Sequence, residues 1–400
     1  MIERKQTEPR LSRYLHSKGA RLGLPIGGNF ELTARCNFNC PMCYVHLKQE
    51  DIDAQGRELT AAQWIELARQ ARDAGMVFVL LTGGEPFVRK DFFEIYKAMK
   101  NMGLMISVNS NGSMLQGEIM QKLLADPPFR MNISLYGGSS ETYCTMCGRP
   151  AYDQVVQNIA ALKKAGVDVR LNVSVTPYNR QDVEAITRKA QELGVHMKLA
   201  SYMYPSIRVN GGRYGYGDRL SPQEAAKASV EWDLLRLDPE TFASRARAMH
   251  DYTLVNENDC AADQDEGVGC RAGSTAFWMT WDGRMLPCGM MPHPVEYPLE
   301  TGFQVAWESI RAKTRALRMP AKCGSCPKRG ACAVCAAVCV TETGHFDRVP
   351  EYVCEMTDAV IRETWKAYEE RKERDEDKKR TGQAGCGRRH HSGACGQDRL

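Results

Sequence analysis

Three cysteines near the start of the chain have the type and the spacing to hold an iron–sulfur cluster. Cys36, Cys40 and Cys43 form a C-x3-C-x2-C pattern, and the aromatic Tyr44 follows the last of them. Three thiolates supply only three of the four ligands of a [4Fe–4S] cluster, so one iron stays open to an outside ligand. An electron-transfer protein normally fills that position, so the missing fourth cysteine indicates chemistry at the iron. A structural zinc knuckle is the alternative that these three residues alone leave open.

A second motif with the composition of a ligand site, Gly83-Gly84-Glu85-Pro86, follows about forty residues later, directly after an apolar run. Glycines allow the backbone to approach a ligand closely, and a carboxylate can pair with an ammonium group. Taken alone, the same four residues are also an ordinary turn. Their position after a predicted strand, and after the three cysteines, favours a binding role.

Together the two motifs resemble those of the radical S-adenosylmethionine (SAM) enzymes, which carry C-x3-C-x2-C before an aromatic residue and a later G-G-E-P motif for the SAM ammonium group. The resemblance implies that SAM chelates the open iron, and that an electron from the cluster cleaves SAM to a 5′-deoxyadenosyl radical. It implies that Cys36, Cys40 and Cys43 are the catalytic metal ligands. It further implies a set of SAM-binding residues: Tyr44, Gly83, Gly84, Glu85, Pro86, Asn109, Asn111, Ser134 and Asn172.

One position departs from the pattern of that family. Many of its members carry an Arg-Gly pair about a dozen residues after the fourth strand, and the arginine helps to hold the SAM carboxylate. Cys147-Gly148 occupies the matching place here, and Arg149 follows. Either Arg149 takes this role in a shifted register, or another group does. Cys144 and Cys147 also form a C-x2-C pair, which is either two partly buried structural thiols or a redox-active or accessory ligand pair.

Nine further cysteines lie toward the C-terminal end: Cys260, Cys270, Cys288, Cys323, Cys326, Cys332, Cys335, Cys339 and Cys354. Asp282-Gly283 predicts the turn of a hairpin within Ser274–Leu286. The spacing of the cysteines around Gly283 resembles the SPASM domain, a C-terminal extension of many radical SAM enzymes that binds two auxiliary [4Fe–4S] clusters. The resemblance implies one ligand set of Cys323, Cys326, Cys332 and Cys354. The other set would be Cys270, Cys288 and a cysteine of the 335–339 group (Cys335 or Cys339), with Cys260 as a candidate fourth ligand. Zinc ribbons are the alternative, because C-x2-C pairs also suit tetrahedral zinc.

The elements that must position these residues are predicted from the hydrophobic pattern. Short apolar runs alternate with helical patterns six times, which predicts a parallel sheet with helices on its outside. In such a sheet, functional residues gather at the carboxyl ends of the strands. The fold class is therefore α/β, and the resemblance makes it a partial (β/α)6 barrel of radical SAM type followed by a small cysteine-rich α+β auxiliary-cluster domain. The predicted strands are 29–34, 77–82, 105–109, 131–135, 169–175 and 197–201.

Changes in composition predict the domain organisation. The expected parts are an N-terminal extension (1–27), the radical SAM partial barrel (28–204), a helical bridge (205–259), a SPASM-like auxiliary-cluster domain (260–365), and a charged helix with a disordered tail (366–400). The tail contains Cys386, His390, His391 and Cys395, which are either part of a disordered segment or a metal site.

Charge and targeting signals exclude several classes of protein. The net charge of +4, from 53 basic and 49 acidic residues, is too small to indicate nucleic-acid binding. We expect no membrane association, because the chain has no apolar run long enough to span a bilayer and no secretory signal. We expect a cytoplasmic protein, where disulfides are a poor explanation for 16 cysteines and iron–sulfur ligation is a better one.

The two resemblances imply an oxidoreductase or maturase that oxidatively modifies a peptide or protein side chain, by a crosslink, a thioether or a dehydrogenation. Its expected partners are that substrate and a reductant such as flavodoxin or ferredoxin. Only 35 residues precede Cys36, too few for a leader-binding domain, so the expected alternatives are a separate leader-peptide carrier or recognition without a leader. The alternatives are a radical SAM dehydrogenase of a small molecule, and a non-enzymatic iron–sulfur or zinc protein that senses redox state or binds a partner.

Overall fold

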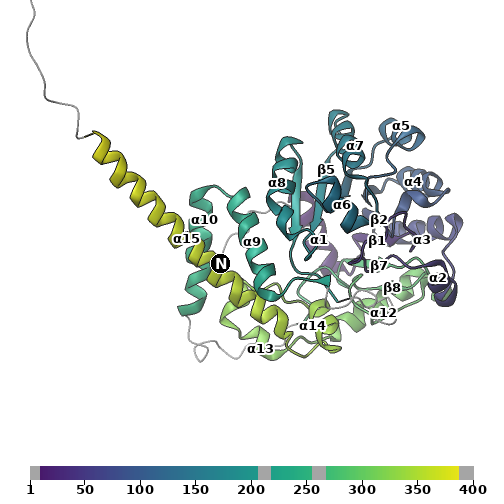
Figure 1. The fold of residues 1–400 in the computed structure, drawn as a ribbon. Coiled ribbons are helices and arrows are strands. Elements are labelled where there is room, and N and C mark those ends of the chain that lie inside the picture. The colour runs from purple at the N-terminus through teal and green to yellow at the C-terminus, as the bar shows by residue number, and fades with distance from the viewer. Residues whose placement is uncertain (1–9, 206–217, 255–266, 387–400) are drawn as a thin grey trace, which may run out of the picture.

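An open sheet forms the centre of the computed structural model, which describes residues 10–205, 218–254 and 267–386. The strand order is β6-β5-β4-β3-β2-β1-β7-β8 (Figure 1). Strands β1 to β6 are all parallel and lie side by side in chain order, which confirms the predicted α/β class. Their bounds are β1 (Gly27–Glu31), β2 (Phe78–Thr82), β3 (Met105–Ser110), β4 (Arg130–Ser134), β5 (Val169–Ser174) and β6 (His196–Ala200).

One helix precedes the first strand and the others connect successive strands, and most of them lie along the outer side of the sheet (Figure 1). Their bounds are α1 (Arg10–Leu22), α2 (Gln49–Gln55), α3 (Ala61–Asp73), α4 (Phe92–Asn101), α5 (Gly117–Ala125), α6 (Ser140–Cys147), α7 (Tyr152–Lys164) and α8 (Val183–Glu192); two short 3-10 helices are η1 (Pro86–Val88) and η2 (Arg180–Asp182). Side chains alternate between the two faces of a strand. On β3, Ile106 and Val108 are buried in the main core, whereas Asn109 is on the opposite face.

That opposite face is polar near the carboxyl ends of the strands. Asn109 on β3 pairs in register with Asn132 on β4, whose side-chain amide donates to the Asn109 oxygen at 2.9 Å. Asn109 in turn lies 3.4 Å from the Thr82 hydroxyl at the end of β2. The sheet therefore buries one apolar face and offers a hydrogen-bonding face on the other side.

The predicted hairpin around Asp282-Gly283 is present, but it belongs to the same sheet. Strand β7 (Ala276–Met279) pairs parallel with β1, and β8 (Met285–Leu286) pairs antiparallel with β7. The sheet thus has eight strands rather than the six expected from the sequence. Phe277 of β7 packs against Phe30 and is fully buried, so burial of apolar surface holds the hairpin to the barrel.

The rest of the described chain is helical. The bridge contains α9 (Pro222–Arg236) and α10 (Pro239–Leu254), and the cysteine-rich region contains α11 (Pro298–Thr301), α12 (Phe303–Ala316), α13 (Ala321–Gly324), η5 (Pro327–Gly330), α14 (Ala336–Thr343) and α15 (Glu351–Cys386). Helix α15 packs against α9 and α10 and then extends away from the body (Figure 1). A second core, which includes Met291, Val338 and Val353, lies in the cysteine-rich region. The proposed domain boundaries stay a prediction, and His390, His391 and Cys395 lie outside the described residues.

No helix in the described ranges combines the length and the apolar character that a bilayer crossing requires.

Candidate active site

The segment that leads to Cys36 runs alongside the Gly83–Pro86 loop. Backbone hydrogen bonds join Leu32 N to Thr82 O at 2.8 Å, Gly84 N to Thr33 O at 2.7 Å and Glu85 N to Arg35 O at 2.9 Å. These bonds continue the pairing of β1 with β2 beyond the ends of both strands. They bring the first predicted cluster ligand next to the predicted SAM-binding motif.

The close approach of these two segments explains the pair of glycines. A Cβ atom on Gly83 would lie 2.4 Å from the Thr33 carbonyl oxygen, and one on Gly84 would lie 2.2 Å from the Arg35 carbonyl oxygen. Gly83 also has a φ of 147°, which side-chain-bearing residues rarely adopt. The glycines are therefore required by contact between two parts of the chain.

The Glu85 carboxylate is fully buried and is bound by protein donors. It accepts hydrogen bonds from the backbone N–H groups of Asn111 at 2.7 Å and Phe87 at 3.2 Å, and from the Ser110 hydroxyl at 3.0 Å. Burial raises the pKa of Glu85 to about 7, although these hydrogen bonds oppose the rise. The geometry thus favours a role in which the carboxylate ties the end of β2 to the end of β3. Direct pairing with an ammonium group would require this fully buried carboxylate to become accessible.

Asn111 connects this carboxylate to the cysteine segment. Its side-chain amide donates to the Asn37 oxygen at 2.8 Å and lies 3.8 Å from the Cys36 sulfur. The Asn37 amide in turn donates to the Ser113 hydroxyl at 2.9 Å. A continuous polar chain therefore runs from Glu85 through Asn111 to the first cysteine.

The three predicted cluster ligands lie close enough to influence one another. Burial raises the pKa of Cys36 to about 12 and of Cys43 to about 11, and in both cases neighbouring thiols add to the rise. Backbone N–H groups point at two of the sulfurs, Phe38 N at 3.4 Å from Cys36 and His46 N at 3.3 Å from Cys43. Such donors favour the thiolate form that metal binding needs.

This donor set fits an iron–sulfur cluster, because clusters are held by cysteine thiolates. Within residues 10–205, 218–254 and 267–386, no three His, Cys, Asp or Glu side chains converge as ligands of a single metal ion would. A [4Fe–4S] cluster binds its cysteines through different iron atoms, so its ligands need not converge in that way.

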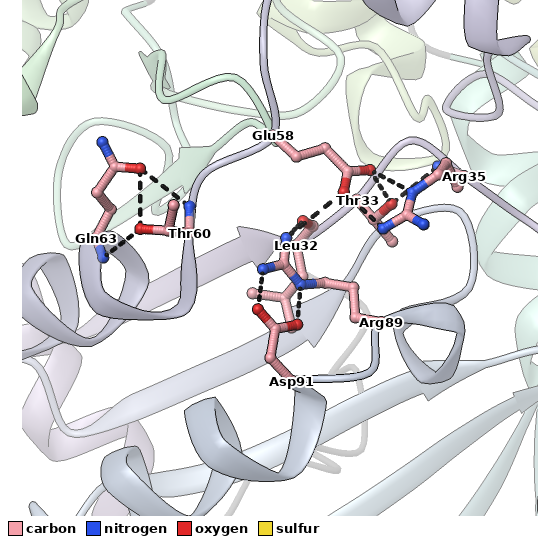
Figure 2. Close-up of polar contacts among 8 residues, drawn as sticks. All are labelled: Leu32, Thr33, Arg35, Glu58, Thr60, Gln63, Arg89 and Asp91. Carbon is pink, nitrogen blue, oxygen red and sulfur yellow. Dashed lines mark hydrogen bonds and ion pairs between the residues drawn. The ribbon is translucent and has the colours of Figure 1, made fainter.

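An ion-pair network holds the same segment from several directions (Figure 2). Arg89, whose side chain is 4% exposed, donates to the Leu32 carbonyl at 2.9 Å and binds both oxygens of Asp91 at 2.9 and 2.7 Å. Glu58 binds Arg35 through two hydrogen bonds of 3.0 and 2.7 Å and also accepts from the Thr33 hydroxyl. The backbone before Cys36 is thereby held on both sides by charged groups.

The capping box that begins α3 fixes the position of Glu58 in this network. The Thr60 hydroxyl accepts from Gln63 N at 3.2 Å, and the Gln63 side chain accepts from Thr60 N at 3.0 Å (Figure 2). One residue earlier, Leu59 N donates to the Trp281 carbonyl at 3.1 Å. The loop before α3 therefore contacts both the hairpin, through Leu59, and the cysteine segment, through Glu58.

The other predicted SAM-binding residues occupy one face of neighbouring strands. Ser134 at the end of β4 pairs in register with Asn172 on β5, and Asn109 lies on the same face of β3. Tyr44 follows directly on the cysteine segment and is half-buried. Arg149, the candidate replacement for the missing arginine, is exposed. The structure brings the strand residues together but does not place Arg149 in the polar chain of Glu85 and Asn111.

The C-terminal cysteines form two groups. The pKa of Cys323 is raised to about 11 by burial and then by the nearby thiols of the first expected ligand set, which are Cys354, Cys332 and Cys326. The second group surrounds Tyr204, whose pKa is raised by burial and then by the members of the other expected set, which are Cys335, Cys288 and Cys270. Burial raises the pKa of Cys339 to about 12, and the thiols of Cys323, Cys335 and Cys332 add to the rise, so Cys339 lies near members of both groups. Cys260 lies outside the described residues.

Several residues at this second group were not foreseen from the sequence. The Tyr204 hydroxyl lies 3.9 Å from the Cys335 sulfur. Nearby, Glu342 accepts from the Tyr202 hydroxyl at 2.6 Å and binds Arg219 through two bonds of 2.6 and 3.1 Å. The only local signal for these contacts is the aromatic character of the segment that follows β6.

The fold and the site together define an α/β enzyme with a three-cysteine loop at the carboxyl edge of a parallel sheet. Residues 30–190 match the model of the Radical SAM superfamily, so this part of the chain is a radical SAM domain. The protein is accordingly an enzyme whose cofactors are a [4Fe–4S] cluster and SAM.

Curated relatives align with 44% to 79% of the chain at modest identity. An AdoMet-dependent heme synthase of Methanosarcina barkeri is 26% identical over 337 residues, which are 79% of this chain and 93% of that protein. A probable GTP 3′,8-cyclase of Saccharolobus islandicus is 34% identical over 179 residues, 44% of this chain and 56% of the relative.

Solved structures share the fold. Streptococcus suis SuiB bound to S-adenosylmethionine has a TM-score of 0.60 at 17% identity, over 86% of this chain and 80% of that one. Native anSMEcpe with bound AdoMet has a TM-score of 0.62 at 15% identity, over 86% of this chain and 100% of that one. At these identities the likeness concerns the fold alone.

Proposed function

We propose that this radical SAM enzyme oxidatively modifies a side chain of a peptide or protein, with one cluster that binds SAM and two auxiliary clusters. The observation that carries the proposal is the presence of two separate cysteine groups in the C-terminal region, in addition to the three-cysteine loop. An auxiliary cluster can accept the electron that a substrate radical must lose to complete its oxidation. A net two-electron oxidation of a side chain is the reaction that such an arrangement serves.

The residues of the first site have distinct tasks. Cys36, Cys40 and Cys43 hold the cluster, and the buried Glu85 positions Asn111 beside the first of them. When bound, the cluster and SAM supply one-electron cleavage of SAM and removal of a hydrogen atom from the substrate. The polar face of the sheet, with the side chains of Asn109, Ser134 and Asn172, orients the bound SAM.

At the second site, Cys323, Cys326, Cys332 and Cys354 hold one auxiliary cluster. Cys270, Cys288 and Cys335 hold the other, with Cys260 or Cys339 as the fourth ligand. Tyr204 lies beside Cys335, so its hydroxyl would face a cluster held by that cysteine. The external reductant is a small electron-transfer protein such as flavodoxin or ferredoxin, and a separate carrier presents the substrate peptide.

A peptide substrate is supported by the shared fold with SuiB, one of whose structures holds the precursor peptide SuiA. A second candidate is a reaction on a tetrapyrrole, which is favoured by the heme synthase relative that aligns over 93% of its own length. The two candidates differ in what the protein must recognise, and one experiment separates them.

The reconstituted full chain is incubated under anaerobic conditions with SAM and dithionite, and with peptides encoded beside its gene or with a porphyrin. The proposal expects SAM cleavage in every arm and a peptide that loses two hydrogens. The Cys43→Ala variant is the matched control and should show neither. Haem formation with no change in any peptide would replace the first candidate by the second.

A further inference from the structure

A fourth thiol lies against the three-cysteine loop and belongs to neither expected ligand set. Cys147 is the last residue of α6, and none of its surface is exposed. Its thiol faces Cys40, and this interaction is the first cause of the raised pKa of Cys40, with burial second. The two residues are far apart in the sequence, so the fold must bring them together.

A backbone hydrogen bond joins the segments that carry the two cysteines. Asn39 N, one residue before Cys40, donates to the Cys147 carbonyl at 3.2 Å. A disulfide needs Cα atoms about 4.4–6.8 Å apart, and this backbone hydrogen bond holds the two segments side by side next to the pair. Helix α6 ends at Gly148, which is in the left-handed conformation. The rings of Phe38 and Tyr143 pack edge to face with their centroids 6.3 Å apart, which adds a second contact between the cysteine loop and α6.

The other two thiols of the loop have different neighbours. The Cys36 sulfur lies beside Phe38 N and the Asn111 amide, and the Cys43 sulfur beside His46 N. Cys40 is thus the thiol of the loop that faces a cysteine outside it.

We propose that Cys40 and Cys147 are a modification site, at which a disulfide forms when dioxygen destroys the cluster that Cys40 holds. The proposal rests on the cluster assignment made above. Two S–H bonds break and one S–S bond forms, while the two electrons and two protons reduce dioxygen to hydrogen peroxide. A disulfide is reversible by thiols, whereas a lone oxidised cysteine proceeds to sulfinic and sulfonic acids. The pair therefore preserves a cluster ligand through exposure to air.

The test starts from the anaerobically reconstituted full chain, whose iron is counted before exposure to air. Free thiols are then alkylated, and the digested protein is mapped by mass spectrometry. We expect a peptide linked through Cys40 and Cys147 in the natural chain and in the matched control Cys144→Ser. In Cys147→Ser, Cys40 should instead carry sulfinic or sulfonic acid, and after treatment with dithiothreitol the variant should regain about two-fold less iron at this site than the control.

A Cys40–Cys43 or Cys36–Cys40 link in the natural chain, or reduced Cys40 after exposure, would overturn the proposal without any variant. Cys147→Ala repeats the comparison if the buried serine prevents folding. The iron count separates the two levels of inference. If the three-cysteine loop takes no iron, the cluster assignment fails, while the peptide map of the same air-exposed sample still shows whether the disulfide forms.

Discussion

Replacing Glu85 with glutamine separates the two roles that this buried carboxylate can have. An amide keeps the size of the side chain but has only one oxygen. If that oxygen accepts from Asn111 N, the shorter bond at 2.7 Å, the NH2 group faces the N–H of Phe87. One buried N–H is then unpaired, which costs about 1–3 kcal/mol.

The loss of charge acts in the opposite direction. Burial raises the pKa of Glu85 from 4.5 to about 7, so the ionised side chain destabilises the fold by about 3 kcal/mol above pH 7, at about 1.4 kcal/mol per pKa unit. This penalty is absent below pH 4.5, grows as the pH rises, and is complete above pH 7. Glu85→Gln should therefore be about 1 kcal/mol more stable than the natural chain at pH 8, where the charge penalty exceeds the cost of about 2 kcal/mol for the unpaired N–H. At pH 5, where most of that penalty is absent, the variant should be about 1 kcal/mol less stable than the natural chain.

SAM affinity is the readout that decides between the roles. If Glu85 acts as a tether, Glu85→Gln keeps the Asn111 contact, and the SAM Kd at pH 8 changes by less than about threefold. Glu85→Ala releases both strand ends, and the loss of a charge-assisted bond of about 1.5–3 kcal/mol weakens SAM binding by about 10- to 150-fold. Anaerobic calorimetry on protein of equal iron content measures both. Equal weakening in the two variants would refute the tether and show that the charge binds SAM directly.

Three further substitutions test the ion-pair network, the close approach of the Gly83–Pro86 loop and the division of the cysteines among the clusters. Arg89→Gln should lower the free energy of unfolding by about 2–4 kcal/mol, because it leaves buried polar partners unpaired. Arg72→Gln, which removes an exposed ion pair, is the control and should lower it by less than about 0.5 kcal/mol. Equal shifts of the two variants in urea unfolding would contradict the role of the network. Gly84→Ala places a Cβ 2.2 Å from a backbone carbonyl oxygen, so we expect it to lose about four irons per chain, and an unchanged iron count would be the contrary result. Cys43→Ala should abolish SAM cleavage and keep about eight irons per chain; loss of all iron would mean that the ligand sets are wrongly divided.

The sequence predicted the six parallel strands to within a few residues, because each alternates apolar and polar side chains or forms a short apolar run. The predicted strand 169–175, for example, is observed as Val169–Ser174. It did not predict that β7 would pair with β1, because pairing between segments so far apart has no local signal. The hairpin itself was predicted, but the place of its two strands in the central sheet was missed for that reason.

The candidate site shows the same limit. The motif residues could be chosen from spacing, since Cys36 and Gly84 each lie just beyond a strand. The reason why glycines are needed could not be predicted, because it is their close contact with backbone carbonyl groups of another segment. The burial of Glu85 among donors, and the contact between Cys40 and Cys147, likewise depend on the tertiary fold.

The most direct test of the account is an anaerobic count of iron and sulfide in the reconstituted chain, followed by addition of SAM with dithionite and an assay for 5′-deoxyadenosine. Three [4Fe–4S] clusters predict about twelve irons per chain, together with formation of 5′-deoxyadenosine. Zinc in place of iron, or full iron content with no cleavage of SAM, would contradict the account.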